Sequence, residues 1–136
     1  MDYAKYCREH KLRNVFFEGF KQQNELPFYY GVADIMTVPS MRDELRLVVN
    51  EEMAASLPVI ASDCAGTTYD LVEHGGSGFQ FKAGEAGEWA HYITELIENE
   101  ALRRQMGERS LEIIQQFSPR KCTEGFLCAI FEFQSP

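Results

Sequence analysis

Short apolar runs alternate along the chain with longer segments in which apolar residues recur every three or four positions. The apolar runs are rich in β-branched and aromatic residues, and they predict strands at 15–20, 35–38, 58–62 and 78–81. Helical spacing and helix-boundary residues predict helices at 25–32, 45–56, 69–74, 89–97 and 100–117. Strands and helices that alternate with short connections are typical of a parallel sheet covered by helices.

The predicted strands are mainly apolar runs rather than alternating patterns of apolar and polar residues, as expected of strands that are covered on both faces. We therefore expect an α/β fold: a Rossmann-like parallel sheet of about four strands flanked by helices, with a helical C-terminal segment. In that segment Ser118 and Pro119 are residue types that begin helices, and many side chains between Phe126 and Phe133 are aromatic. An apolar stripe with helical spacing is expected to pack in the core, and it consists of Trp89, Tyr92, Ile93, Leu96 and Ile97.

The chain has 136 residues and a formal net charge of −8, so it has the size of one domain or of part of a larger one. The acidic balance argues against a nucleic-acid-binding module and against a surface that binds anionic lipid. It leaves a small ligand with phosphate groups open, because backbone amides bind phosphate without net positive charge.

Cysteine spacing and hydropathy bear on the cellular compartment. The four cysteines form no C-x-x-C pair, and no histidine stands at metal-ligand spacing from them. We therefore expect free thiols, with neither a metal site nor a disulfide framework. The apolar runs are too short to span a bilayer, and residues 1–10 lack the features of a signal peptide. These features predict a cytoplasmic protein, and they leave open a peripheral position at the membrane for the full-length protein.

Ligands of open parallel sheets bind beyond the carboxyl ends of the strands. The loops after Val38, after Ser62 and around Gly19 are therefore the places to look for function. Gly19 either allows a ligand to approach the backbone closely or simply permits a turn. The loop from Ala65 to Thr68 follows a predicted strand and opens a short helix, so its backbone N–H groups either cradle a phosphate or only form the turn.

Two acids bracket the predicted helix at 45–56. Asp43 precedes it and Glu51 lies eight residues later, which separates them by roughly 12 Å along a helix axis. That distance is too long for a general acid/base pair of carboxylates, which needs about 5 to 9.5 Å. It suits two acceptors that hold the hydroxyls at the two ends of an elongated ligand. From the spacing alone, an ordinary solvated helix face is the favoured interpretation.

Several further runs of residues resemble, in their order and spacing, those of the family 4 retaining glycosyltransferases of glycosyltransferase group 1. The resemblance extends over about Val15 to Phe117. The runs are Glu25-Leu26-Pro27-Phe28-Tyr29-Tyr30, Ala33-Asp34, Pro39-Ser40, Leu47-Val48-Val49-Asn50-Glu51-Glu52-Met53-Ala54, Leu57-Pro58-Val59-Ile60-Ala61-Ser62-Asp63, Asp70-Leu71-Val72-Glu73 and Gly78-Phe79. The resemblance implies the GT-B architecture, in which two Rossmann-like domains face each other and the C-terminal one binds the sugar-nucleotide donor. Residues 1–136 look like a single partial domain, the later part of that C-terminal domain. By this resemblance, we expect the N-terminal acceptor domain and the usual basic pair for the diphosphate to be absent from these residues.

The family carries a Glu-x7-Glu signature, whose second acid corresponds to Glu51 and is implied to hold the nucleotide ribose. The first acid, implied to hold donor-sugar hydroxyls, corresponds to Asp43, and its neighbour Glu44 is the alternative. The resemblance also implies a set of donor-binding residues: Ser40, Gly19, Ala65, Gly66, Thr67, Thr68, Leu47 and Val48. The sequence departs from the family pattern at three positions, where Arg46 and Ser56 replace common glycines and Glu52 replaces an alanine.

The resemblance implies the donor-binding portion of an enzyme that transfers a sugar from a nucleotide-diphosphate sugar to an acceptor with retention of configuration. It implies no cofactor and no metal, and we expect this chain to be inactive without its acceptor domain. The expected partners are a nucleotide sugar and the missing N-terminal domain, and nucleic acid is not among them. The alternative is a non-catalytic Rossmann-like remnant that serves as an interaction or oligomerisation module and self-associates through the Phe-rich C-terminus.

Overall fold

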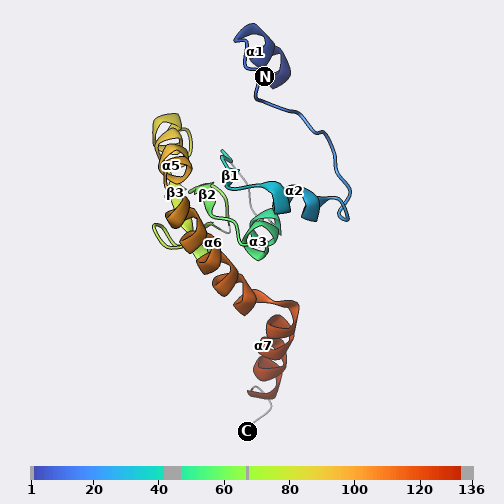
Figure 1. Ribbon diagram of the computed structural model, residues 1–136. Helices are drawn as coiled ribbons and strands as arrows, with labels where there is room; N and C mark the ends of the chain where they lie inside the picture. The colour runs from blue at the N-terminus through green and yellow to red at the C-terminus, as the bar shows by residue number, and fades with distance from the viewer. Residues whose placement is uncertain (1, 42–46, 67, 133–136) are drawn as a thin grey trace.

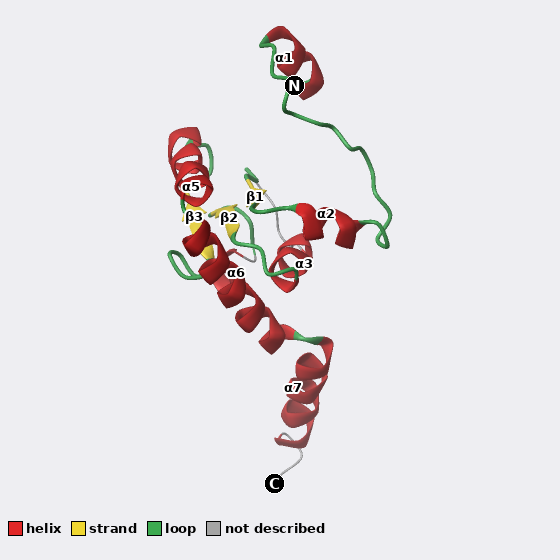
Figure 2. Ribbon diagram, in the orientation of Figure 1, coloured by secondary structure: helices red, strands yellow, loops and turns green. Residues whose placement is uncertain are grey.

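The computed structural model describes residues 2–41, 47–66 and 68–132. At its centre lies a parallel sheet of three strands in the order β1-β2-β3 (Figures 1 and 2). The strands are β1 (Met36–Val38), β2 (Val59–Ser62) and β3 (Gly78–Phe81). The register pairs Thr37 with Ile60, and Ala61 with Gln80. This architecture confirms the α/β class and three of the predicted strands.

Helices flank the sheet and extend from it at both ends of the chain. They are α1 (Tyr3–Glu9), α2 (Leu26–Val32), α3 (Leu47–Ala54), α4 (Thr68–Leu71), α5 (Ala86–Glu98), α6 (Glu100–Ile114), the 3-10 turn η1 (Gln115–Phe117) and α7 (Pro119–Glu132). The predicted helices are thus confirmed within a few residues at their ends. The sequence analysis missed α1, which begins where the Asp2 carboxylate accepts a hydrogen bond from the Lys5 N–H at 3.0 Å.

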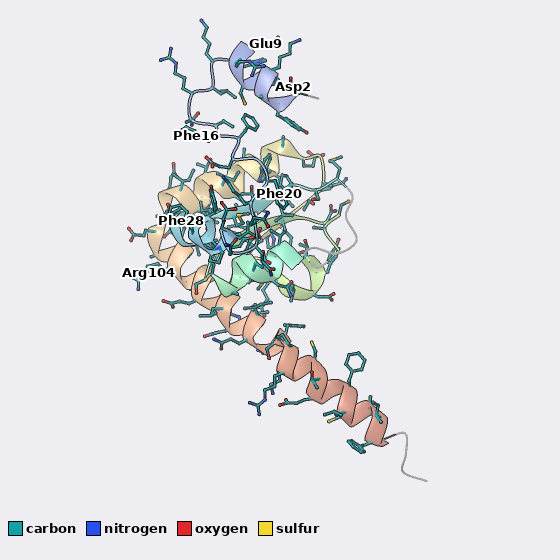
Figure 3. The ribbon with its side chains drawn as sticks, turned by 90° about the vertical axis from the view of Figure 1, so that its right-hand side faces the viewer. Asp2, Glu9, Phe16, Phe20, Phe28 and Arg104 are labelled. Carbon is teal, nitrogen blue, oxygen red and sulfur yellow. The ribbon has the colours of Figure 1, made fainter. Side chains whose placement is uncertain are left out.

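The strand predicted at 15–20 is wrong. These residues belong to a long connection between α1 and α2 that runs outside the sheet (Figure 1). Figure 3 shows Phe16 on this connection, and the side chains of Phe16 and Phe20 are 79% and 87% exposed. An apolar run becomes a strand only when a neighbouring backbone completes its hydrogen-bond ladder, and the described strands offer no such neighbour to this segment. The sheet therefore has three described strands instead of about four.

The core consists of two clusters on opposite faces of the sheet. Side chains alternate along a strand, so Val59 and Ala61 of β2 pack on one face and Ile60 on the other. The first face is covered by α3 and the end of α6, and the second by α5 and the start of α6. The predicted stripe of α5 lies in the second cluster, with Leu96 fully buried, but Ile97 is 63% exposed and does not belong to the core.

Two residues after the end of α3, Ser56 has a left-handed backbone with φ of +59°. The resemblance described above implies a glycine at this position, and glycine adopts such a φ without strain. The Ser56 carbonyl faces Gly107 of α6, and a Cβ built on Gly107 would lie 2.1 Å from that oxygen. The contact between α3 and α6 therefore depends on the absence of a side chain at Gly107.

Helix α7 projects away from the sheet (Figures 1 and 3). It begins as the sequence predicts, with the Lys121 N–H donating to the Ser118 hydroxyl at 3.4 Å and Pro119 as the first helical residue. Its apolar side chains are exposed, and they are Phe126, Leu127, Ile130 and Phe131. Among the described helices, none is long and apolar enough to cross a membrane.

Candidate functional site

The carboxyl ends of the three strands meet at one edge of the sheet, because the strands are parallel. Hydrogen bonds tie the loops at this edge together. The Ser62 hydroxyl at the end of β2 donates to the Ser40 carbonyl after β1 at 2.5 Å. The Asp63 carboxylate after β2 accepts from the Ala83 N–H after β3 at 2.8 Å. Ser40, a predicted site residue, is therefore part of a fixed edge, whereas Asp63 was not singled out from the sequence.

Glu51 lies half-buried on α3, and its carboxylate accepts a hydrogen bond from the hydroxyl of Tyr30 on α2 at 2.8 Å. Burial, and then the hydrogen bond to Glu51, raise the pKa of the Tyr30 hydroxyl well above its ordinary value. Tyr30 therefore remains a hydrogen-bond donor at neutral pH. The sequence analysis did not assign a role to Tyr30, and the Tyr30–Glu51 pair joins residues that lie 21 positions apart in the sequence.

Two grooves meet at Glu51. The first has a volume of about 500 Å³ and runs between α2 and α3, with walls that include Leu26, Tyr30 and Ala54. The second has a volume of about 590 Å³ and runs between α3, the end of α6 and the start of α7. Its walls include Leu111 and Phe117, and the Glu51 carboxylate is a polar group within largely apolar surroundings. Such concave, mostly apolar surfaces with a few polar groups are typical of small-molecule sites.

The loop predicted to bind phosphate forms a closed turn. The Ala65 N–H donates to the Ser62 carbonyl at 3.1 Å, and the Thr68 N–H donates to the Ala65 carbonyl at 2.8 Å. Ala65 and Thr68 are fully buried, whereas Gly66 is exposed. These two N–H groups are therefore engaged within the turn, and the exposed backbone at Gly66 is the part of the described loop that faces solvent.

Gly19 lies on the exposed connection between α1 and α2 and has φ of +68°, so a glycine suits this turn. The turn is joined to α2 by the Tyr29 hydroxyl, which donates to the Glu18 carboxylate at 3.0 Å. Nothing lies within 4 Å of a Cβ built on Gly19, and the connection that carries it runs outside the sheet (Figure 1).

Other predicted site residues divide into two groups. Val48 is half-buried on α3 and packs against the core, and Leu47 is the first residue of that helix. Asp43, Glu44 and Thr67 lie outside the described residues, as does Arg46. Within the described ranges no three histidine, cysteine, aspartate or glutamate side chains gather as metal ligands. All four cysteines are free thiols, as predicted.

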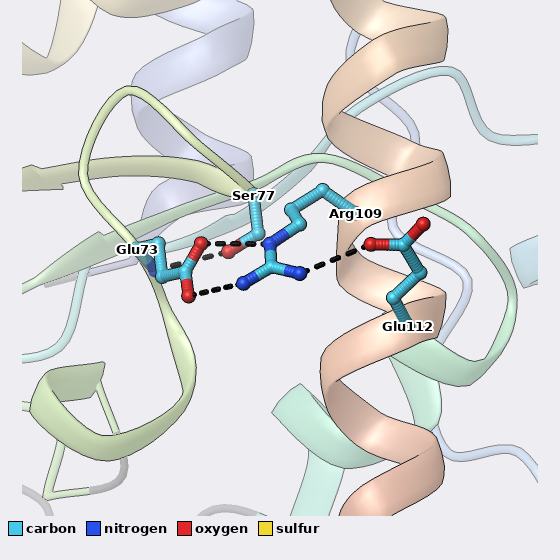
Figure 4. Close-up of polar contacts among 4 residues, drawn as sticks. All are labelled: Glu73, Ser77, Arg109 and Glu112. Carbon is cyan, nitrogen blue, oxygen red and sulfur yellow. Dashed lines mark hydrogen bonds and ion pairs between the residues drawn. The ribbon is translucent and has the colours of Figure 1, made fainter.

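An ion-pair cluster at the opposite edge of the sheet was missed by the sequence analysis (Figure 4). The Arg109 guanidinium on α6 donates to both carboxylate oxygens of Glu73, at 2.8 and 2.7 Å, and to Glu112 at 3.0 Å. The hydrogen bond from Arg109 holds the pKa of Glu73 below its ordinary value. The Glu73 N–H donates to the Ser77 hydroxyl at 3.0 Å, so the cluster fixes the turn that leads into β3.

Comparison with known proteins identifies what this chain is similar to. Residues 3–112 match the family described as glycosyl transferases group 1. An uncharacterized glycosyltransferase of Haemophilus influenzae is 34% identical over 101 residues, which are 74% of this chain and 29% of that protein. The chain spans less than a third of that relative's length.

Solved structures agree with this result. The Anabaena protein Alr3699/HepE in complex with UDP-glucose is 26% identical, with a TM-score of 0.75, over 85% of this chain and 31% of that one. The C-terminal domain of the group 1 glycosyl transferase LpcC of Francisella tularensis has the same fold, with a TM-score of 0.74 at 20% identity, over 83% of this chain and 58% of that one. The family model matches most of the chain, and the described sheet and helices have the fold of these solved structures. This chain belongs to the glycosyl transferases group 1 family.

Proposed function

We propose that this chain is the donor-binding portion of a retaining glycosyltransferase of family 4. It would bind a nucleotide-diphosphate sugar and, together with an acceptor-binding N-terminal domain outside this chain, transfer the sugar with retention of configuration. The family membership supports the transferase class, and the UDP-glucose bound by Alr3699/HepE supports a nucleotide sugar as the ligand. The likeness in fold to the C-terminal domain of LpcC supports the assignment to part of a C-terminal domain.

The observation that carries the proposal is the position of Glu51. Its carboxylate is half-buried, is held by Tyr30 at 2.8 Å and lies where two grooves meet. A carboxylate in such surroundings is a strong acceptor for a pair of neighbouring hydroxyls, because a hydrogen bond to a charged group gains strength away from water. We assign to Glu51 the two hydroxyls of the nucleotide ribose.

The remaining roles follow the family pattern. Asp43 is proposed to hold the donor sugar, with Glu44 as the alternative, and Ser40, Leu47 and Val48 line the donor beside them. The loop of Ala65, Gly66, Thr67 and Thr68 is proposed for the diphosphate, with Gly66 as its exposed backbone. Gly19 is proposed to approach the nucleotide only in the complete protein, because here it lies on an exposed turn.

In a retaining transfer without a protein nucleophile, the leaving phosphate assists the attacking hydroxyl on the same face of the sugar. The protein then contributes positioning of the donor and stabilisation of developing charge. No metal or cofactor is required by this scheme. We expect this chain alone to transfer no sugar, because the acceptor must be held by the other domain.

The exposed apolar side of α7 is the surface on which we expect a protein partner to pack. Phe126, Leu127, Ile130 and Phe131 lie on this helix, and each is about half exposed or more. The proposed partner is the N-terminal domain, and in its absence the same side chains favour self-association.

The test of the proposal is calorimetry of nucleoside diphosphates on the full protein that contains this chain. Glu51→Gln should weaken binding by roughly 1.5 to 3 kcal/mol, because it removes the charge from the acceptor of two hydrogen bonds. Glu98→Gln, an exposed change at the end of α5, is the matched control and should leave the affinity unchanged. If Glu51→Gln binds each of UDP, GDP and ADP with the same affinity as the wild type, Glu51 does not hold the ribose.

A further inference from the structure

Tyr30 and Glu51 join two helices that are far apart in the sequence. Tyr30 lies in the last turn of α2 and Glu51 in the middle of α3, and the tyrosine hydroxyl donates to Glu51 Oε2 at 2.8 Å. Both side chains are half-buried, and both line the groove of about 500 Å³. The hydrogen bond therefore lies at the wall of the groove and not on an outer surface of the molecule.

The bond limits the conformations of the Glu51 side chain. A glutamate has three rotatable side-chain bonds, and fixing a flexible side chain on ligand binding costs affinity. A donor that already holds one carboxylate oxygen removes part of this cost before the ligand arrives. Each carboxylate oxygen has two acceptor positions, so Oε1 and the second position of Oε2 still have the capacity to accept hydroxyls.

Tyr30 is suited to this task because it stays protonated. Tyr30 is half-buried at the wall of the groove between α2 and α3, and burial raises the pKa of its hydroxyl. The proton that holds Glu51 is therefore present throughout the neutral and mildly basic pH range.

We propose that Tyr30 is a positioning residue that orients the Glu51 carboxylate toward the two hydroxyls of a ribose. This inference rests on the proposed function, in which Glu51 binds the nucleotide ribose. Tyr30 touches no substrate in this scheme, and it acts only through Glu51.

The chain offers a matched control in the neighbouring tyrosine. The Tyr29 hydroxyl donates to a carboxylate as well, that of Glu18, at 3.0 Å on the exposed turn before α2. Tyr29→Phe and Tyr30→Phe thus each remove a tyrosine hydroxyl, from adjacent positions of one helix. Both variants keep the aromatic ring.

The experiment compares UDP with 2′,3′-dideoxy-UDP, which lacks both ribose hydroxyls, by calorimetry on the full protein that contains this chain. The wild type should prefer UDP about tenfold or more, since two hydrogen bonds to a charged group are lost with the dideoxy compound. Tyr30→Phe should reduce this preference about three- to tenfold, and Tyr29→Phe should leave it unchanged. In a Glu51→Gln background, Tyr30→Phe should change the preference less than twofold, because both variants act on one interaction.

Each alternative outcome is distinct. A wild type that binds UDP and the dideoxy compound equally, or binds neither, overturns the ribose role of Glu51 and the inference with it. A wild-type preference that Tyr30→Phe retains overturns the inference alone. A loss of affinity in Tyr30→Phe that is equal for both compounds shows a structural tie between α2 and α3, and it also overturns the positioning role.

Discussion

Gly107 is the position where one added methyl group should disturb the packing that supports α3. In Gly107→Ala the new Cβ would lie 2.1 Å from the carbonyl oxygen of Ser56, whereas ordinary contact begins at 3.4 Å. The obstructing atom belongs to the backbone, so no side chain is able to rotate away. The backbone of α6 or of the residues that follow α3 must therefore shift.

The expected cost follows from two opposing effects. Overpacking of a close contact costs up to about 3 kcal/mol, and alanine regains about 1 kcal/mol over glycine in a helix interior. The free energy of unfolding should therefore fall by about 2 kcal/mol. For a chain of this length, the melting temperature should fall by roughly 6 to 10 °C.

Urea and thermal unfolding followed by circular dichroism measure this change. Gly87→Ala in the first turn of α5 is the matched control, because nothing lies within 4 Å of its added Cβ. That variant should be neutral or should stabilise by up to about 1 kcal/mol. Gly107→Ala with wild-type stability would refute the view that the backbone contact at Ser56 requires glycine.

Three further predictions concern the cap of α3, the ion-pair cluster and the first acid. Ser56→Gly should raise the free energy of unfolding by about 1 kcal/mol in urea denaturation, because φ of +59° strains a residue with a Cβ; no gain would contradict this. The pKa of Glu73 lies below its ordinary 4.5, so the bond from Arg109 stabilises the fold above about pH 4.5 and the gain is lost as the pH falls through the lowered value. Glu73→Gln should flatten the loss of stability between about pH 5 and pH 3, and an unchanged profile would argue against the pair. In sugar transfer by the full protein, Asp43→Ala should lower the rate on the order of 100-fold and Glu44→Ala should not; the reverse order would assign the first acid to Glu44.

The sequence by itself determined the elements whose causes are local. The apolar run at 78–81 is a strand as predicted, and Pro119 begins α7 directly after the Ser118 cap. In these cases the backbone preference of a few neighbouring residues decides the conformation.

Only the tertiary structure decided the features that need partners from distant parts of the chain. The apolar run at 15–20 has strand propensity, yet it lies outside the sheet because no described strand completes its ladder. Ile97 fits the helical stripe but is 63% exposed, and it belongs to neither core cluster of the described residues. Propensity and periodicity predict which residues are able to be buried, and tertiary packing determines which of them are buried.

The candidate site divides in the same way. Glu51 stands out in the sequence through the family resemblance of the residues around it, and not through its spacing from Asp43 alone. Its partner Tyr30 is 21 residues away, and Arg109 reaches Glu73 across 36 residues. A local sequence pattern does not predict contacts between residues so far apart in the sequence. They arise when the parallel sheet forms and α2, α3 and α6 pack around it, and that step brings a tyrosine hydroxyl to the carboxylate that the sequence had marked.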